Sequence, residues 1–168
     1  LWPDLGIRKI DYIKKLIELS SYILPHTTNR FLTTIRYPDG IEGKSFYQKK
    51  ITKYTPNWIN SIKKDNDFYI NLNKLPTLVW LGNQAALELH TTFSKYHDKY
   101  ITNLVFDLDP SEGQDFNHVI EAAIIIYEEL NKLNIRSYPK TSGSSGLQIY
   151  IPIENKYTYE VGRKINEF

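Results

Sequence analysis

The chain has 168 residues, 41% of them hydrophobic, which suits a single domain with a sizeable core. It contains no cysteine, so disulfides and thiolate metal sites are excluded, and no apolar run approaches the roughly 20 residues that cross a bilayer. The net charge of +2 hides an asymmetry: residues 1–64 carry twelve Lys and Arg against five Asp and Glu, whereas residues 65–168 carry nine against fourteen. A basic half joined to an acidic half is typical of a polyanion-binding surface beside a metal site, although ordinary scatter of surface charge gives the same totals.

The first part of the chain predicts a helix followed by extended segments. Apolar residues at helical spacing indicate an amphipathic helix over residues 8–23. Residues 31–36 are β-branched and extended, residues 37–40 supply a turn, and residues 45–48 form a short returning strand. The remaining pattern predicts helices over residues 76–90 and 116–133, and strands over residues 101–106, 135–139 and 147–153.

These elements predict a mixed α/β fold, with a mixed sheet, flanking helices and a βαβ-like unit around residues 107–109. No linker divides the chain, so we expect one domain over residues 1–168. The final residues have a helical pattern, and the chain begins without Met, so we expect a fragment of a longer protein.

Two acids follow the apolar strand. Successive side chains of a strand alternate in direction, so the carboxylates of Asp107 and Asp109 point the same way. Two carboxylates about 4 Å apart repel by ~4 kcal/mol at an effective dielectric near 20, and a hard divalent cation removes that cost. The pair therefore predicts a metal site for phosphate chemistry. The alternative is a pair of solvated turn residues or helix caps.

Between the last two strands lies a run of serine and glycine. Backbone N–H groups exposed by glycine, together with hydroxyl donors, can surround a phosphate, but a plain hairpin turn has the same composition. Basic and aromatic residues are also interleaved near the N-terminus, which suits nucleic acid because phosphates are neutralised while bases stack at about 1–3 kcal/mol each. The alternative is a solvated basic face over core aromatics. These residues are Lys9, Arg36, Lys44, Lys49 and Lys50 with Trp2, Tyr12, Tyr37, Phe46 and Tyr47.

Ordered motifs along the whole chain resemble one family, the polymerase domain of the bacterial multifunctional non-homologous end-joining DNA ligase D, within the archaeo-eukaryotic primase superfamily. The two most specific motifs are LVFDLDP (104–110) and PKTSG with GLQIY (139–150). The others are WP (2–3), GIRKIDY (6–12), LPH (24–26), RYPDG (36–40), GKSFYQK (43–49), PTLVW (76–80) and AALELH (85–90). The resemblance implies a primase-polymerase-like fold.

The resemblance also implies roles for individual residues. Asp107 and Asp109 are catalytic and would bind two metal ions, Mn²⁺ or Mg²⁺. The nucleotide triphosphate would be held by the serine-glycine run and its neighbours, with a further contact from His90. These residues are Lys140, Ser142, Gly143, Ser144, Ser145 and Gln148. DNA would be bound by Lys9, which matches a lysine that grips a 5′-phosphate, and by Arg36, Phe46, Tyr47 and Lys49.

By the same resemblance the substrates are double-stranded DNA ends with a 5′-phosphate and an NTP or dNTP. The partners are a Ku-type end-binding protein and an ATP-dependent ligase domain. The expected location is the bacterial cytoplasm, at the nucleoid, with no membrane association.

Three departures from the family pattern affect these expectations. Ser145 stands where the family often has lysine, so Lys140 or another basic residue is expected to supply the missing cation. Gln148 stands where the family often has histidine and can still donate one hydrogen bond. The family's third catalytic carboxylate lies on a strand beyond Phe168, so the chain by itself is expected to lack full activity.

Two other functions stay open: a phosphohydrolase using the Asp-x-Asp pair, and a non-catalytic binder of 5′-phosphorylated DNA ends.

Overall fold

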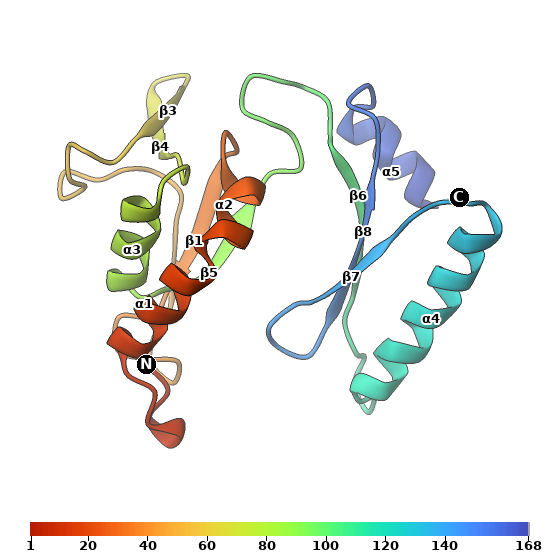
Figure 1. Cartoon of the computed structure of the whole chain (residues 1–168), viewed down its shortest axis with the longest axis horizontal. Coiled ribbons are helices and arrows are strands. Elements are labelled where there is room, and N and C mark those ends of the chain that lie inside the picture. The colour runs from red at the N-terminus through yellow and green to blue at the C-terminus, as the bar shows by residue number, and fades with distance from the viewer. Residues whose placement is uncertain (168) are drawn as a thin grey trace. The chain divides into compact units, whose positions relative to one another are not determined.

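The computed structural model describes residues 1–167 and divides the chain into two compact units, Leu1–His97 and Asp98–Phe168 (Figure 1). The charge asymmetry follows this division, because the first unit has 14 Lys and Arg against 8 Asp and Glu and the second has 7 against 11. The expectation of one domain over residues 1–168 stays a prediction.

The first unit contains three α-helices and two small antiparallel sheets. Strands β1 and β5 pair over residues far apart in sequence, and β2 lies on the other side of β1, giving the order β2-β1-β5. Strands β3 and β4 form a separate hairpin. After a 3-10 turn at Pro3–Leu5, the elements are α1 (Lys9–Glu18), α2 (Ser20–Thr27), β1 (Leu32–Arg36), β2 (Phe46–Gln48), β3 (Ser61–Lys64), β4 (Asp67–Ile70), α3 (Leu75–Asn83) and β5 (Ala86–Thr91).

The core of this unit joins the helices to one face of the β2-β1-β5 sheet. Leu16 of α1, Leu78 and Leu81 of α3, and Leu32 and Ala86 of the sheet belong to one buried cluster. Helices α1 and α3 approach closely because α3 has a glycine at the crossing, where an added Cβ would lie 2.8 Å from a methyl of Leu16. The burial of large apolar side chains in this cluster, each contributing about 1.5–3 kcal/mol, stabilises the layer.

The second unit is a three-stranded sheet with two helices. Its elements are β6 (Asn103–Leu108), α4 (Phe116–Lys132), β7 (Tyr138–Thr141), β8 (Leu147–Pro152) and α5 (Tyr159–Glu167). The order is β6-β8-β7, and both outer strands are antiparallel to β8. Strands β6 and β7 therefore run parallel to each other and are joined through α4, which confirms the predicted βαβ-like unit.

The two faces of this sheet differ in character. Both α4 and α5 lie on the same side of it (Figure 1), where Leu104, Ile149 and Ile151 are buried. Helix α5 packs against β6 through Gly162, because an added Cβ there would lie 3.1 Å from the Leu104 side chain. The alternation of side chains along β6 sends Asp107 to the opposite face, which these helices leave free.

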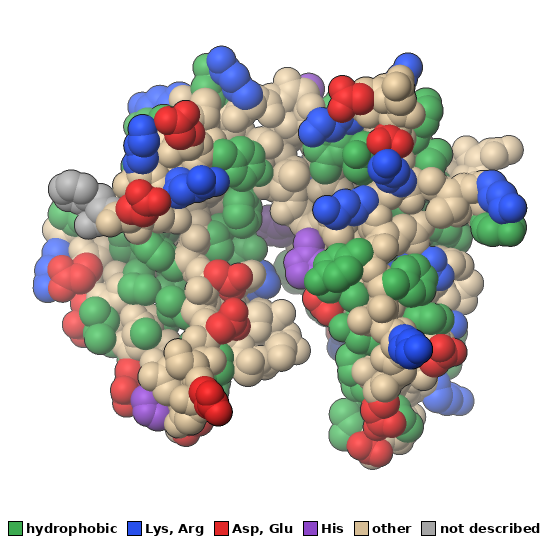
Figure 2. Space-filling model, turned by 180° about the vertical axis from the view of Figure 1, so that it is seen from behind, with side chains coloured by type: hydrophobic (Ala, Val, Ile, Leu, Met, Phe, Trp, Pro, Cys, Tyr) green, Lys and Arg blue, Asp and Glu red, His purple; other side chains and the backbone are tan. Residues whose placement is uncertain are grey.

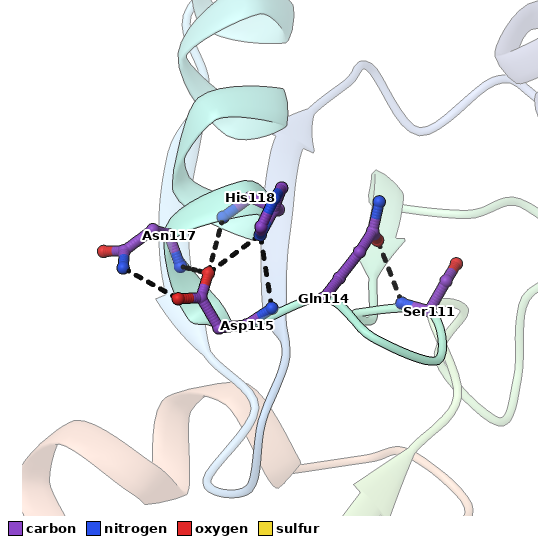
Figure 3. Close-up of polar contacts among 5 residues, drawn as sticks. All are labelled: Ser111, Gln114, Asp115, Asn117 and His118. Atoms are coloured by element: carbon purple, nitrogen blue, oxygen red, sulfur yellow. Dashed lines mark hydrogen bonds and ion pairs between the residues drawn. The ribbon is translucent and has the colours of Figure 1, made fainter.

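A capped turn links the end of β6 to α4. The Asp115 carboxylate accepts hydrogen bonds from the backbone N–H groups of Asn117 (3.0 Å) and His118 (3.4 Å), and His118 Nδ1 lies 2.8 Å from the same carboxylate (Figure 3). These hydrogen bonds lower the pKa of Asp115, with the His118 side chain making the largest contribution. Upstream, Gln114 Oε1 accepts from the Ser111 N–H at 3.0 Å. The cap pairs N–H groups that have no partner within the helix and holds the segment between Asp109 and α4 in place.

The mixed α/β fold class is confirmed, but two predicted helices are wrong in extent. Residues 8–23 do not form one helix, because the chain turns at Leu19 and continues as α2 to Thr27. The predicted helix over residues 76–90 ends at Asn83, where Ala85 takes a left-handed conformation (φ 54°). His90 therefore lies on strand β5, because residues 86–91 pair with β1 and take an extended conformation.

The other elements are close to their predicted positions. The strands β1, β2, β6 and β8 and helix α4 occur within about two residues of the predicted ends, while β7 begins three residues later than predicted. The hairpin β3–β4 was not predicted. No helix within residues 1–167 combines the length and apolar character that a membrane crossing requires.

Candidate active site

The acidic pair lies where β6 ends. Asp107 is inside the strand and Asp109 follows it directly, so the strand extends two residues further than predicted. Both side chains are exposed, and within the described residues 1–167 no hydrogen bond or ion pair engages either carboxylate. Two unengaged carboxylates held by a paired strand can serve as oxygen ligands for a cation.

A row of polar side chains crosses the free face of the sheet at Asp107. Asp107 is opposite Gln148 on β8, which is opposite Lys140 on β7. Tyr150, two residues along β8, donates its O–H to the Gln148 amide oxygen at 3.2 Å, and Lys140 Nζ lies 5.9 Å from the Tyr150 ring centroid. The Gln148 side-chain carbonyl thus accepts from Tyr150, while no hydrogen bond within residues 1–167 engages its NH₂ group, which stays available as a donor.

The Ser-Gly run forms the hairpin turn between β7 and β8. The Ser142 N–H donates to the Gly146 carbonyl at 2.9 Å, and Gly143 has φ 96°, which favours glycine. Ser142 Oγ accepts from the backbone N–H groups of Ser144 (3.3 Å) and Gly146 (3.0 Å). Two N–H groups therefore converge on one oxygen, which is the arrangement that a phosphate oxygen needs. The run is therefore a hairpin turn closed by its own serine hydroxyl, and Ser145 is exposed on it.

The turn and the acidic pair meet at Gly146. An added Cβ at this residue would lie 2.7 Å from the Leu108 carbonyl oxygen and would overlap the Asp109 carboxylate. Gly146 is buried by this contact. Asp109 and Gly146, 37 positions apart in the sequence, are therefore in direct contact because β6 and β8 are neighbours in the sheet.

The donor set fits a divalent cation in part. Carboxylate oxygens are ligands that Mg²⁺ and Mn²⁺ accept, and both ions leave coordination positions for water and for phosphate oxygens. Within residues 1–167 no three Asp, Glu, His or Cys side chains gather as a metal site. Asp107 and Asp109 are two of the expected ligands, and the expected third carboxylate beyond Phe168 stays a prediction.

Arg36 in the first unit is anchored by glutamines that the sequence did not single out. Its Nε donates to the Gln84 carbonyl (2.9 Å), one terminal nitrogen donates to Gln84 Oε1 (2.7 Å), and the other donates to Gln48 Oε1 (2.8 Å). Burial lowers the pKa of the Arg36 guanidinium. Its carbon centre lies 5.0 Å from the centroid of the Phe46 ring. Arg36 thus fixes Phe46 through a cation–π contact of about 0.5–2 kcal/mol.

The two aromatic residues of β2 face opposite sides of the sheet. Phe46 is opposite Arg36, whereas Tyr47 is opposite Ile35, the next residue of β1. Their side chains are 45% and 72% exposed, respectively, so each can stack against a flat ligand on its own side. The structure therefore brings Arg36 and Phe46 together and separates them from Tyr47.

His90 lies on the same side of the sheet as Tyr47. Ile35 is opposite both Tyr47 and Glu88, and His90 is two residues beyond Glu88 on β5. His90 Nε2 lies 2.9 Å from Glu88 Oε2. Glu88 would have been noticed from the sequence if residues 86–91 had been predicted as a strand, because its spacing from His90 then places both on one face.

Basic side chains lie beside hydrophobic ones over this unit (Figure 2), and three of its lysines lie over aromatic rings. Lys9 is the first residue of α1, where unpaired N–H groups and the helix dipole favour an anion. Lys49 is exposed directly after β2. Among the described residues 1–167, neither lysine takes part in an ion pair, whereas Lys50 pairs with Asp67 at 2.8 Å.

Comparison with known proteins agrees with this geometry. A family described as "LigD, primase-polymerase domain" matches residues 8–168. The bifunctional non-homologous end joining protein LigD of Bacillus subtilis is 39% identical over 160 residues, covering 95% of this chain and 26% of that protein. The multifunctional protein LigD of Mycolicibacterium smegmatis is 30% identical over 160 residues, covering 91% of this chain and 21% of that protein.

A solved structure has the same fold. The polymerase domain of Mycobacterium tuberculosis ligase D in complex with DNA superposes with a TM-score of 0.81 at 28% identity, covering 92% of this chain and 58% of that one. Fold and paired acids define a primase-polymerase domain. The chain belongs to the LigD primase-polymerase domain family, and it spans about a quarter of the length of the relatives named above. The phosphohydrolase alternative has no support in these matches.

Proposed function

We propose that this chain binds DNA ends and a nucleoside triphosphate and transfers a nucleotide to the DNA 3′ end during non-homologous end joining. The observation that carries this proposal is the contact between Gly146 and Asp109, which joins a phosphate-type turn to a pair of carboxylates. A polymerase site needs that neighbourhood, because the triphosphate must lie within reach of the metal ligands.

In the proposed reaction the DNA 3′-hydroxyl oxygen forms a bond to the α-phosphorus. The bond from that phosphorus to the leaving pyrophosphate breaks, and the hydroxyl proton is released. The turn holds the triphosphate through N–H groups now bonded to Ser142 Oγ, with Gln148 and Lys140 adding an NH₂ donor and a cation. Ser144 and Ser145 line the same turn. His90 is a further nucleotide contact in this proposal.

Asp107 and Asp109 would hold Mn²⁺ or Mg²⁺, with two ions expected in the complete site. When bound, these ions neutralise phosphate oxygens and activate the attacking hydroxyl. The residues themselves provide orientation: the β6–β8 pairing fixes Asp107 opposite Gln148, and Gly146 keeps the Asp109 carboxylate close to the turn.

DNA binding is proposed for the basic and aromatic residues of the first unit. Lys9 offers a cation at a helix N-terminus for a 5′-phosphate, and Lys49 offers another beside β2. Phe46, supported by Arg36, and Tyr47 provide stacking surfaces. The DNA-bound structure of the M. tuberculosis relative supports this assignment. A ligase domain, a Ku-type partner and a nucleoid-associated cytoplasmic location belong to the same proposal.

The test replaces Asp107 with Asn in the full-length protein and measures Mn²⁺-dependent extension of a primed DNA end. Extension should fall by about 100-fold or more, since a metal ligand contributes several kcal/mol of transition-state stabilisation. Glu112→Gln is the matched control, because it removes one exposed negative charge from the same unit and should leave extension unchanged. Extension by Asp107→Asn at the wild-type rate would contradict the proposal. Retained end binding without extension in wild type would instead favour the non-catalytic DNA-end binder.

A further inference from the structure

Tyr150 lies on the free face of the second unit's sheet. It belongs to β8, the middle strand, where it is opposite Val105 of β6 and Tyr138 of β7. Because side chains two residues apart on a strand share a face, Tyr150 lies on the same side of the sheet as Gln148 and its partner Asp107. The Tyr150 side chain is half-buried, and hydrogen-bonded strands on both sides of β8 fix its backbone.

The Tyr150 hydroxyl decides which end of the Gln148 amide is available to a ligand. It donates to Gln148 Oε1 at 3.2 Å. The oxygen and the NH₂ group of an amide exchange places when the last side-chain bond turns by about 180°, so an amide without a partner can present either end. A donating hydroxyl selects the oxygen, and no hydrogen bond within residues 1–167 engages the NH₂ group. Gln148 is therefore held as a donor.

The ring of Tyr150 holds a second donor, Lys140 of β7. Lys140 Nζ lies 5.9 Å from the ring centroid, within the range at which a cation is attracted to an aromatic face. The lysine side chain is exposed and its four-carbon stem is flexible. Its Nζ also donates to the neighbouring Thr141 carbonyl at 3.3 Å, and no ion pair within residues 1–167 engages it. The ring contact therefore keeps the ammonium group over the free face of the sheet.

One tyrosine thus contacts both donors of the polar row that begins at Asp107. In this row Asp107 is opposite Gln148, which is opposite Lys140. Adjacent strands are about 4.8 Å apart, so the strands that carry the two ends of the row are roughly 10 Å apart. A cation bound to the carboxylate would attract one part of an extended polyphosphate, and the NH₂ and ammonium groups would bind oxygens further along it.

We propose that Tyr150 is a positioning residue that holds Gln148 through its hydroxyl and Lys140 through its ring, so that both donors face the polyphosphate of a nucleotide bound at Asp107. The identity of the ligand rests on the proposed function, whereas the geometry rests on the hydrogen bond and the ring contact within one sheet. Tyr150 itself makes no contact with the nucleotide in this arrangement. Its effect is transmitted through the two donors.

Two substitutions of Tyr150 in the full-length protein separate the effect of its hydroxyl from that of its ring. Tyr150→Phe removes the hydroxyl and keeps the ring, so it should raise the nucleotide KM about threefold and leave kcat within about twofold. Tyr150→Leu removes both contacts and should raise KM about tenfold, because both donors must then be ordered by the ligand. The Kd of inorganic tripolyphosphate in the presence of Mn²⁺, measured by calorimetry, should change by the same factors.

Double variants test whether these effects pass through the two donors. In a Gln148→Ala background, Tyr150→Phe should have no further effect on KM, and adding Lys140→Ala should remove the effect of Tyr150→Leu as well. An equal loss from Tyr150→Phe with and without Gln148 would overturn the positioning role. Tyr127→Phe is the matched control, because it removes an exposed hydroxyl from α4, on the other side of the same sheet (Figure 1), and should leave KM and Kd unchanged.

Proton NMR gives a readout that a purely structural role would not change. The ring current of Tyr150 should shift the ε-methylene signals of Lys140 upfield in wild type and in Tyr150→Phe, and Tyr150→Leu should abolish this shift. An unshifted Lys140 signal in wild type would overturn the ring contact. If wild type extends no DNA end, the proposed function fails, while tripolyphosphate binding and the Lys140 shift still decide the role of Tyr150.

Discussion

Replacing Gly146 with Ala tests the contact between the acidic pair and the turn at residues 142–146, the proposed triphosphate site. The added Cβ would lie 2.7 Å from the Leu108 carbonyl oxygen, whereas ordinary contacts begin at 3.4 Å, and it would overlap the Asp109 carboxylate. The spacing between β6 and β8 must therefore open by about 0.7 Å at this point, or Asp109 must rotate away. Overpacking of this size costs about 1–3 kcal/mol of stability.

The functional effect should exceed the loss of stability. A misplacement of about 1 Å among reacting groups can reduce a rate about 100-fold, so Gly146→Ala should reduce Mn²⁺-dependent extension by about 10–100-fold. The Mn²⁺ concentration for half-maximal activity should rise, because Asp109 is a proposed ligand. The assay is extension of a primed DNA end over a Mn²⁺ titration, with urea unfolding measured in parallel.

Gly113→Ala is the matched control. Gly113 has φ 83° and no atom within 4 Å of an added Cβ, so alanine there introduces backbone strain of about 1–2 kcal/mol without touching Asp109. The control should lose stability and keep its Mn²⁺ dependence. If Gly146→Ala keeps its extension rate and half-maximal Mn²⁺ concentration within twofold of wild type, the contact does not couple the turn to the metal ligands.

Three further changes test parts of the structure that support the site. Tyr12→Phe removes the hydrogen bond from Tyr12 to the Ala86 carbonyl (2.7 Å) and should cost about 1 kcal/mol in urea unfolding; an unchanged midpoint would contradict this. Burial raises the pKa of Tyr12 to about 12, so its stabilising contribution is complete below about pH 10 and is lost between pH 10 and 12. Wild-type stability should therefore fall more steeply than that of Tyr12→Phe over this range. Arg36→Ala should weaken binding of primed DNA about threefold to tenfold by releasing Phe46, and Phe46→Ala in that background should add little; additive losses in equilibrium binding would show that the two act separately. Asp115→Ala removes the α4 cap and should lower the melting temperature by a few degrees, whereas Asp115→Asn should largely retain it; equal losses in thermal unfolding would refute a capping role.

Local patterns predicted much of the second unit. A continuous apolar run ending in Asp107 predicts a strand with acids at its end, and strong helical periodicity predicts α4. The Ser-Gly run between two apolar segments predicts a turn between two strands. These predictions succeed because each signal lies within one element, where alternation, helical spacing and glycine conformation act over a few residues.

The placement of His90 could not be obtained in this way. Apolar spacing after Pro76 continues a helical pattern, and only the pairing of β5 with β1, more than 50 residues earlier, makes residues 86–91 a strand. The same pairing places Glu88 beside His90 and Tyr37. The anchoring of Arg36 by Gln84 also depends on chain segments 48 positions apart. Long-range pairing overrides local preference where a strand gains both hydrogen bonds and a buried face.

The sequence by itself determined the acidic pair, the turn and the family to which the chain belongs. The tertiary structure decided that the turn touches Asp109, that Arg36 packs on Phe46, and that a carboxylate holds His90. The difference has one physical reason. Residue type and spacing define which chemistry a side chain can perform, whereas the pairing of distant strands defines which side chains can perform it together.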